Sequence, residues 1–473
     1  MGRTAKLWVV WLLSTLLGGA VLLAAMIFGG PLRANLLIGK TTGGHHQIEL
    51  ACEACHTSPF GGGEVLQEAC VGCHKEELAA AKDSHPLKKF RDPRNADRLA
   101  KLDATRCVTC HREHKPEITG AMGVTLPGDY CKLCHENVAK DRPSHVGATF
   151  DTCASAGCHN YHDNRALYED FLEQHAGEPD VKEPAVVELR VQENEAIEER
   201  KPLTTVDAAN APSDKLADHA ITGEWLATAH SKAGVNCAGC HAPKKKAAAE
   251  IAAAWSDHPP AAVCAACHEH EEKSFTQGKH GMRLAAGMKS QVAGLFGVFR
   301  DAPLSPMPVA LARLPMSEKA EGRELTCVSC HGAHDFDTTE AQVESCTGCH
   351  ADEHTKAYAG SPHDKLWRAE IAGQGPKGTG VSCATCHLPR QAIEDPETYT
   401  ERIVANHNQN DSLRPNEKMI RSVCMGCHGL QFSIDALADT GLIKRNFTGR
   451  PERHIKSIEW VMDRVRKGES KGP

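Results

Sequence analysis

The chain carries its most reactive side chains in one repeated spacing, in which two cysteines are followed at once by a histidine. Ten copies read Cys-x-x-Cys-His, and an eleventh is stretched to Cys-x4-Cys-His at Cys153 and Cys158. The eleven pairs use all 22 cysteines of the chain. The paired cysteines are Cys52 and Cys55, Cys70 and Cys73, Cys107 and Cys110, Cys131 and Cys134, Cys153 and Cys158, Cys237 and Cys240, Cys264 and Cys267, Cys327 and Cys330, Cys346 and Cys349, Cys383 and Cys386, and Cys424 and Cys427.

This spacing predicts covalent attachment of haem c. The two thiols can add to the two vinyl groups along one edge of a porphyrin, and the adjacent histidine then lies beneath the ring as the proximal iron ligand. We therefore expect eleven haem c groups. The predicted proximal ligands are His56, His74, His111, His135, His159, His241, His268, His331, His350, His387 and His428.

Two other uses of cysteine fit the pattern less well. A structural zinc ion takes two Cys-x-x-Cys pairs, and eleven is an odd number of pairs. Disulfide bonds would be compatible with an oxidising compartment, but they leave the histidine after every pair unexplained.

A haem iron with a second histidine on its open face transfers electrons, whereas an open position lets the iron bind a substrate. Subtracting the eleven motif histidines from 28 leaves 17. Seven of these precede an acidic stretch near residue 190 and serve five motifs, and ten follow it and serve six. The candidate distal ligands are His45, His46, His85, His114, His145, His162, His175, His230, His258, His280, His334, His354, His363 and His407; the other spare histidines are His219, His270 and His454.

Spacing indicates which haem these histidines reach. A histidine three residues after a motif cannot reach the far side of its own haem, so we expect His114, His162 and His334 to bind a neighbouring haem. A second group lies some 10 to 13 residues after a motif. A short helix would carry each of these to the next haem, and the group comprises His85, His145, His280 and His363.

The N-terminus predicts a membrane anchor. Arg3 and Lys6 precede an uncharged run over residues 7–29, which is long enough for a bilayer span and longer than most secretory signal cores. The alternative is a cleaved signal peptide. Positive charge before the span keeps the N-terminus cytoplasmic, so we expect a single-pass inner-membrane protein with its bulk in the periplasm. The span has no histidine and cannot hold a bis-histidine haem.

Composition predicts five segments and a mainly α fold with extensive loops. Aromatic residues make up 5% of the chain, so we expect haems to replace side chains in the interior. We find no alternating strand pattern. The expected segments are the anchor (1–35), a five-haem domain (36–175), an acidic linker without cysteine or histidine (176–216), a six-haem domain (217–455) and a polar tail (456–473).

Several motifs resemble known families. The N-terminal half resembles the small class III cytochromes, which are bis-histidine throughout, and its anchor resembles that of membrane-bound quinol-oxidising cytochromes. Residues 225–437 resemble the hydroxylamine oxidoreductase family, which is related to the pentahaem nitrite reductases. This second resemblance rests on Gly278-Lys279-His280, on the Cys-x-x-Cys-His-x-x-His motif ending at His334, and on Asp352 and His354 after the motif at Cys346.

The chain departs from the enzymes of that family at the reaction centre. Their catalytic haem motif lies just before the Cys-x-x-Cys-His-x-x-His motif, but residues 269–326 contain no cysteine here. Their cross-linking tyrosine after the last motif also has no counterpart, since Tyr399 is the last tyrosine. The resemblance therefore implies the family's electron wiring without its catalytic haem, and we assign no catalytic residue.

Two functions remain in view. The first is an electron conduit of anaerobic respiration, passing electrons from a quinol-linked membrane donor to a periplasmic or outer-membrane cytochrome or reductase, with no nucleic-acid partner. The alternative is a haem-dependent reductase of a small nitrogen or sulfur compound such as nitrite, hydroxylamine or tetrathionate. The alternative requires one haem with an open distal position.

The haem count is directly measurable. We predict that the intact mass of the mature protein exceeds that of its polypeptide by eleven haem groups, because all eleven motifs can form thioethers. A mass excess of ten haems would show that the stretched site at Cys153 and Cys158 is empty.

Overall fold

The structure is a computed structural model that describes most of the chain. It describes residues 2–27, 37–58, 62–81, 85–128, 130–142, 145–146, 159–163, 167, 169–192, 202–203, 205–216, 218–285, 287–293, 299–394 and 399–467. The stretched motif at Cys153 and Cys158 and the acidic run 193–201 lie outside the described residues.

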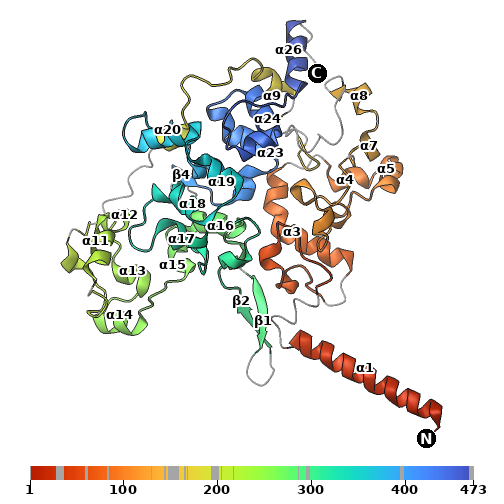
Figure 1. The fold of residues 1–473 in the computed structure, drawn as a ribbon, viewed down its shortest axis with the longest axis horizontal. Helices are drawn as coiled ribbons and strands as arrows, with labels where there is room; N and C mark the ends of the chain where they lie inside the picture. Colours follow the sequence, from red (N-terminus) through yellow and green to blue (C-terminus); the bar gives the residue numbers. More distant parts are fainter. Residues whose placement is uncertain are drawn as a thin grey trace. The chain divides into compact units, whose positions relative to one another are not determined.

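The chain folds mainly into short α-helices joined by loops, as predicted (Figure 1). Two helices are long, α1 (Arg3–Ile27) and α3 (Gly63–Ala80). The other α-helices are α4 (Leu87–Phe90), α5 (Ala96–Lys101), α6 (Cys107–Cys110), α7 (Lys132–His135), α8 (Val138–Asp141), α9 (Glu169–Gln174), α10 (Glu188–Val191), α11 (His219–Ala227), α12 (Ala229–Lys232), α13 (Cys237–His241), α14 (Ala248–Ala254), α15 (Ala261–Ala265), α16 (Glu269–Gln277), α17 (Val328–His331), α18 (Glu344–Cys349), α19 (Glu353–Tyr358), α20 (Pro362–Ile371), α21 (Cys383–His387), α22 (Gln409–Leu413), α23 (Asn416–Ser422), α24 (Leu430–Ala438), α25 (Thr440–Lys444) and α26 (Ser457–Arg466).

Two short antiparallel hairpins correct the prediction that the chain has no strands. Strands β1 (Lys289–Ala293) and β2 (Phe299–Pro303) pair with Lys289 opposite Pro303, and β3 (Arg390–Glu394) pairs with β4 (Glu401–Ala405). Each strand has only five residues. The pattern was missed because five residues of mixed polarity carry little periodic signal, and the pairing itself supplies the stability.

Helix α1 has the length and composition of a bilayer span. Its 25 residues rise about 37 Å at 1.5 Å per residue, which exceeds a hydrocarbon core of about 30 Å. The most apolar window is Thr4–Val21, and none of it is buried against the protein. The large side chains of Leu7, Trp8 and Trp11 are more than half exposed. This helix suits either a signal anchor or a signal sequence.

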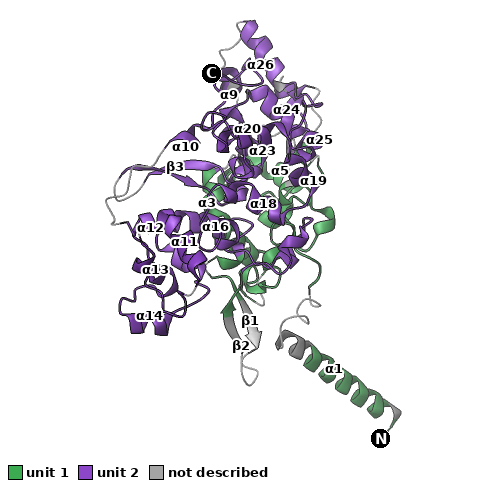
Figure 2. Cartoon of the chain, turned by 60° about the vertical axis from the view of Figure 1, so that its left-hand side comes forward, with its two compact units in different colours: residues 1–80, 86–133, 283–305 green, residues 81–85, 134–282, 306–473 purple. Residues whose placement is uncertain are grey.

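The described chain divides into two compact units, coloured separately in Figure 2. Unit 1 comprises residues 1–80, 86–133 and 283–305, and unit 2 comprises residues 81–85, 134–282 and 306–473. The 283–305 segment joins unit 1 through hairpin β1–β2 and through Arg283, whose guanidinium donates to the Gln47 carbonyl at 2.6 Å. These units are defined by compactness, whereas the predicted five-haem and six-haem domains are defined by the positions of their motifs. The boundaries of the predicted domains therefore stay predictions.

Unit 2 contains the main side-chain core. It consists of buried aliphatic side chains from α9, α23, α24 and α26, and Ile420, Leu430, Ile434 and Val461 in it have no measurable exposure. Cys386 and Cys424 of two haem motifs pack against it. The other buried clusters are small, such as that of Val343, Tyr358 and Trp367.

Part of the predicted linker is attached to unit 2. The Lys182 amide donates to the Cys427 carbonyl at 2.8 Å, and the Gly429 amide donates to the Pro179 carbonyl at 3.0 Å. Arg190 forms an ion pair of 2.7 Å with Glu370, and both side chains are nearly buried. These contacts fix residues 179–190 against the last motif and α20; the linker as a whole stays a prediction.

Because α1 makes no buried contacts, its removal has a clear expected outcome. Replacing residues 7–29 by a cleavable signal should release a soluble protein with its full haem content and unchanged absorbance spectrum. Fractionation of membranes and measurement of the haem-to-protein ratio provide the test. A native protein that is already soluble and begins near residue 30 would show that this segment is a cleaved signal.

Candidate functional site

Each of the ten described haem motifs forms one tight helical turn. In six of these, where the bond lies outside a regular helix, the amide of the histidine donates to the carbonyl of the first cysteine, at 2.8 to 3.1 Å. This turn holds the two thiols and the imidazole in a fixed relation along the chain. The six motif histidines with this bond are His56, His111, His268, His331, His350 and His428. None of the twenty described cysteines is in a disulfide bond.

A second histidine ring faces the motif histidine in nine of the motifs. The ring centroids of each pair lie 6.0 to 6.3 Å apart. The pairs, with the motif histidine second, are His45–His74, His85–His135, His145–His159, His230–His268, His334–His241, His280–His350, His407–His331, His354–His387 and His363–His428.

This separation fits an iron bound between two imidazoles. With a metal–nitrogen distance of about 2 Å on each side and about 1.1 Å from nitrogen to ring centre, the two centres lie about 6.2 Å apart. Direct stacking of two rings would bring them closer, as for His241 and Trp255 at 4.5 Å. The described residues hold no cluster of three or more Cys, His, Asp or Glu that could bind a zinc ion. The donor set therefore suits haem iron.

Burial keeps several of these rings neutral, as an iron ligand must be. Desolvation lowers the pKa of His280, His363 and His387 to about 4 each, with smaller contributions from neighbouring histidines. A neutral imidazole offers a lone pair to a metal at pH 7.

Backbone carbonyls orient one ring in five of the nine pairs. The Nδ1 atoms of these rings lie 2.5 to 3.0 Å from a carbonyl oxygen, which directs Nε2 toward the paired ring. The contacts are His85 with Tyr161, His241 with Ser256, His354 with Ile443, His407 with Ala405, and His428 with Asp180.

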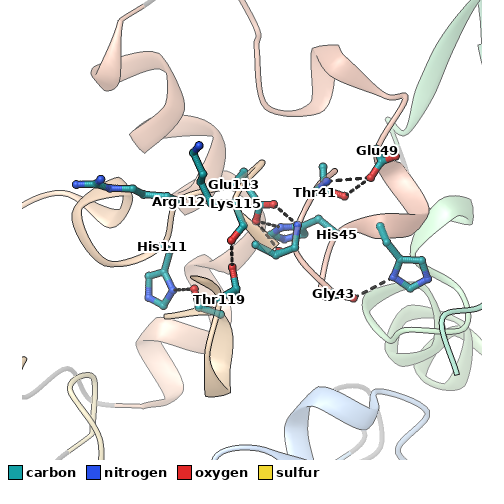
Figure 3. A network of polar contacts seen from close by, with 12 residues as sticks. Thr41, Gly43, His45, Glu49, His111, Arg112, Glu113, Lys115 and Thr119 are labelled. Atoms are coloured by element: carbon teal, nitrogen blue, oxygen red, sulfur yellow. Dashed lines mark hydrogen bonds and ion pairs between the residues drawn. The ribbon is translucent and has the colours of Figure 1, made fainter. Parts of the chain in front are cut away.

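The pair His45–His74 has carboxylates in this role instead. Figure 3 shows the carboxylate of Glu113 directed at the ring of His45. Glu113 lies 2.6 Å from Nδ1 of His45, and Glu77 lies 3.0 Å from Nδ1 of His74. Partial burial raises the pKa of Glu113, but hydrogen bonds from His45 and Thr42 outweigh that effect and lower it to about 2. Neither glutamate stands out in the sequence, although Glu77 follows a motif histidine by three residues on α3.

The pairing differs in part from the expected order. His145 faces the next motif, as the spacing predicts. The other histidines that follow a motif by 10 to 13 residues pass the next motif and face the one after it, and these are His85, His280 and His363. His334 faces His241, which lies two motifs back.

The nine pairs leave five distal candidates, and the structure gives most of them other contacts. Nδ1 of His46 contacts the Gly43 carbonyl, and Nδ1 of His114 contacts the Gly39 carbonyl. His175 contacts Glu178 at 2.8 Å, and the ring of His162 lies 5.3 Å from that of Tyr161. His258 is exposed. The motif histidines outside these nine pairs are His56 and His111.

Cysteines of consecutive motifs lie close to one another. In unit 2 the side chains of Cys264 and Cys327 lie within hydrogen-bonding range, as do those of Cys346 and Cys383. Longer-range electrostatic interactions link Cys240 with Cys264, Cys330 with Cys346 and Cys386 with Cys427, so the six motifs from Cys237 to Cys427 form one series. In unit 1 Cys70 and Cys107 lie within hydrogen-bonding range, and longer-range interactions link Cys55 with Cys73 and Cys110 with Cys131.

Asp352 and His354 have separate roles in this structure. Asp352 is the N-cap of α19, where its carboxylate accepts from the Thr355 amide at 3.1 Å and from the Thr355 hydroxyl at 2.8 Å. The ring of His354 faces His387 at 6.1 Å. The arrangement therefore suits an iron ligand beside a helix cap.

Replacing one facing histidine should open one iron. We predict that His354→Ala gives a high-spin electron paramagnetic resonance signal from about one haem in eleven, because the motif histidine His387 alone leaves a vacant position. The matched control is His258→Ala, which should leave the spin state unchanged. A His354→Ala protein without high-spin iron would contradict the pairing.

Parts of this chain are similar in sequence to known cytochromes. A family model described as cytochrome c3 matches residues 44–136. A cytochrome c-552 of Haemophilus ducreyi is 26% identical over 159 residues, covering 30% of this chain and 29% of the relative. A cytochrome c-552 of Haemophilus influenzae is 24% identical over 223 residues, covering 37% and 35%. The chain thus spans about a third of these relatives.

No solved structure matches the chain. The cytochrome c3 match covers the first four motifs, whereas the cytochrome c-552 relatives match at low identity. The repeated cysteine–histidine turns, the paired imidazoles and these matches agree with one another. The chain is a multihaem c-type cytochrome.

Proposed function

We propose that the protein is a membrane-anchored periplasmic cytochrome that conducts electrons along eleven haems, most of them with two histidine ligands. The observation that carries the proposal is the set of nine imidazole pairs at 6.0 to 6.3 Å. An iron with both axial positions filled by imidazole exchanges electrons without binding a substrate.

The closeness of successive motifs supports conduction over a long distance. Six successive motifs in unit 2 are linked in this way, so we expect their haems to be neighbours. The first four motifs are linked likewise; three of them lie wholly in unit 1, and the fourth begins there at Cys131. A chain of adjacent redox centres suits transfer between two partners better than turnover at one centre.

The sixth ligands of the haems at His56 and His111 come, in this proposal, from the remaining candidates. Those that lie in the same unit as these two haems are His46 and His114. His114 lies too close in sequence to His111 to bind the same iron, so we assign it to another haem.

The donor and acceptor follow from the predicted location. With α1 in the inner membrane, the motif at Cys52 is the first to follow the span along the chain, so its haem is the one that we expect a quinol-linked donor to reduce. The acceptor would be a periplasmic or outer-membrane cytochrome or reductase. The sequence similarity to cytochromes c-552 covers a third of their length and assigns no substrate to this chain.

The competing function is reduction of a small nitrogen or sulfur compound at an open haem. All six motif histidines of residues 217–455 face another histidine, which argues against an open position in that half. His354, the counterpart of an enzymatic histidine in the resembled family, is one of the facing rings.

The test is spin state together with turnover. We predict that the oxidised protein shows only low-spin iron by electron paramagnetic resonance, and that hydroxylamine, nitrite and tetrathionate turn over only at trace rates with a dye donor or acceptor. Exposed low-spin haems can give such trace rates adventitiously. A clear high-spin signal with substrate-dependent turnover would refute the conduit and favour the reductase.

A further inference from the structure

The pair His45–His74 differs chemically from the other pairs that the structure describes. Both of its rings have a carboxylate at Nδ1, Glu113 for His45 at 2.6 Å and Glu77 for His74 at 3.0 Å. In five other pairs, one ring has its Nδ1 atom against a neutral backbone carbonyl instead. Two carboxylates, one at each ligand ring, therefore distinguish this site from those five pairs.

The carboxylate of Glu113 is held in place from several sides. Its Oε2 accepts from the Thr42 amide at 2.7 Å, and its Oε1 accepts from the Thr42 hydroxyl at 2.8 Å as well as contacting His45. These donors stabilise its ionised form. Glu77 lies one helical turn after His74 on α3, the spacing at which side chains on a helix meet.

A carboxylate at Nδ1 changes the iron through the ring. It draws the Nδ1 proton toward itself, makes the imidazole more electron-donating and favours the ferric state. The negative charges also oppose the electron that reduction adds, since like charges repel at short range. A neutral carbonyl supplies the orientation without the charge.

We propose that the haem attached at Cys70 and Cys73 has the lowest reduction potential in the chain, and that Glu113 and Glu77 set it. The inference rests on the proposed function, because it takes His45 and His74 as the two ligands of one iron. The step concerned is the gain of one electron by ferric iron, with no bond formed or broken.

The haem at Cys70 and Cys73 lies between the first and third motifs of the series, so a low potential there would affect electron flow. The cysteines of this motif lie close to those of both neighbouring motifs: Cys70 lies within hydrogen-bonding range of Cys107, and Cys73 interacts electrostatically with Cys55 at longer range. Electrons moving along unit 1 would then cross a site that is the hardest in the chain to reduce. The two glutamates would limit how readily charge passes from the first haem to the third.

The experiment is a redox titration of the full haem-loaded protein, followed by electron paramagnetic resonance and absorbance. Glu113→Gln and Glu77→Gln keep a hydrogen-bond acceptor and remove the charge. Each should shift the one-electron equilibrium of the lowest-potential component about tenfold toward the reduced state, or about 59 mV. The double variant should shift it further. His45→Met should raise the potential of the same component strongly, which assigns that component to this haem.

Glu49→Gln is the matched control. Its carboxylate accepts from the Thr41 amide and hydroxyl in the same network, so the variant removes the same charge nearby (Figure 3). This control variant should shift the one-electron equilibrium of the lowest-potential component less than twofold. Should Glu113→Gln fail to load haem, Glu77→Gln on the helix surface tests the same claim.

An unmoved lowest component in Glu77→Gln and Glu113→Gln would overturn the proposal, as would an equal shift in Glu49→Gln. High-spin iron with substrate turnover in the unmodified protein would instead refute the proposed function. The potential shifts would remain measurable in that case, so the two failures can be told apart.

Discussion

An iron held between two imidazoles requires their rings to lie about 6 Å apart, and the rest of this fold is arranged to meet that distance. The motif turn supplies one ring at a fixed place in the chain. The other ring must be brought from elsewhere, and it comes from a distant segment in several pairs, such as His334 with His241 and His407 with His331. In the proposed function, these ligand pairs would cross-link distant parts of the chain.

Apart from these pairs, the described residues have few apolar contacts that join distant segments of the chain. Its main apolar core lies in the C-terminal part of unit 2, where α23, α24 and α26 pack together. Outside it, the buried clusters involve only a few side chains each. A chain with 5% aromatic residues cannot fill a large interior by itself. In the proposed function, the porphyrins supply the missing apolar volume.

Polar contacts orient the ligand rings and differ between sites. A backbone carbonyl fixes the ring of His428 through Asp180, a residue of the segment that the sequence marks as a linker. Asp352, which resembles an enzymatic acid in sequence, caps a helix beside His354. The same residue types therefore serve catalysis in the resembled family and support a ligand here.

The sequence by itself determined the attachment sites, since each motif is local and its chemistry depends on neighbouring residues. It also determined the supply of spare histidines, the apolar α1 and the mainly helical class. It did not determine which imidazoles face each other. His280 lies twelve positions after His268, yet it faces His350, because the partner depends on how distant helices pack. Nor did it reveal Glu113 beside His45, a contact across 68 positions. The two hairpins likewise needed pairing between strands too short to carry a periodic signal. Only the tertiary structure brings such groups together, because their proximity is a property of the folded chain.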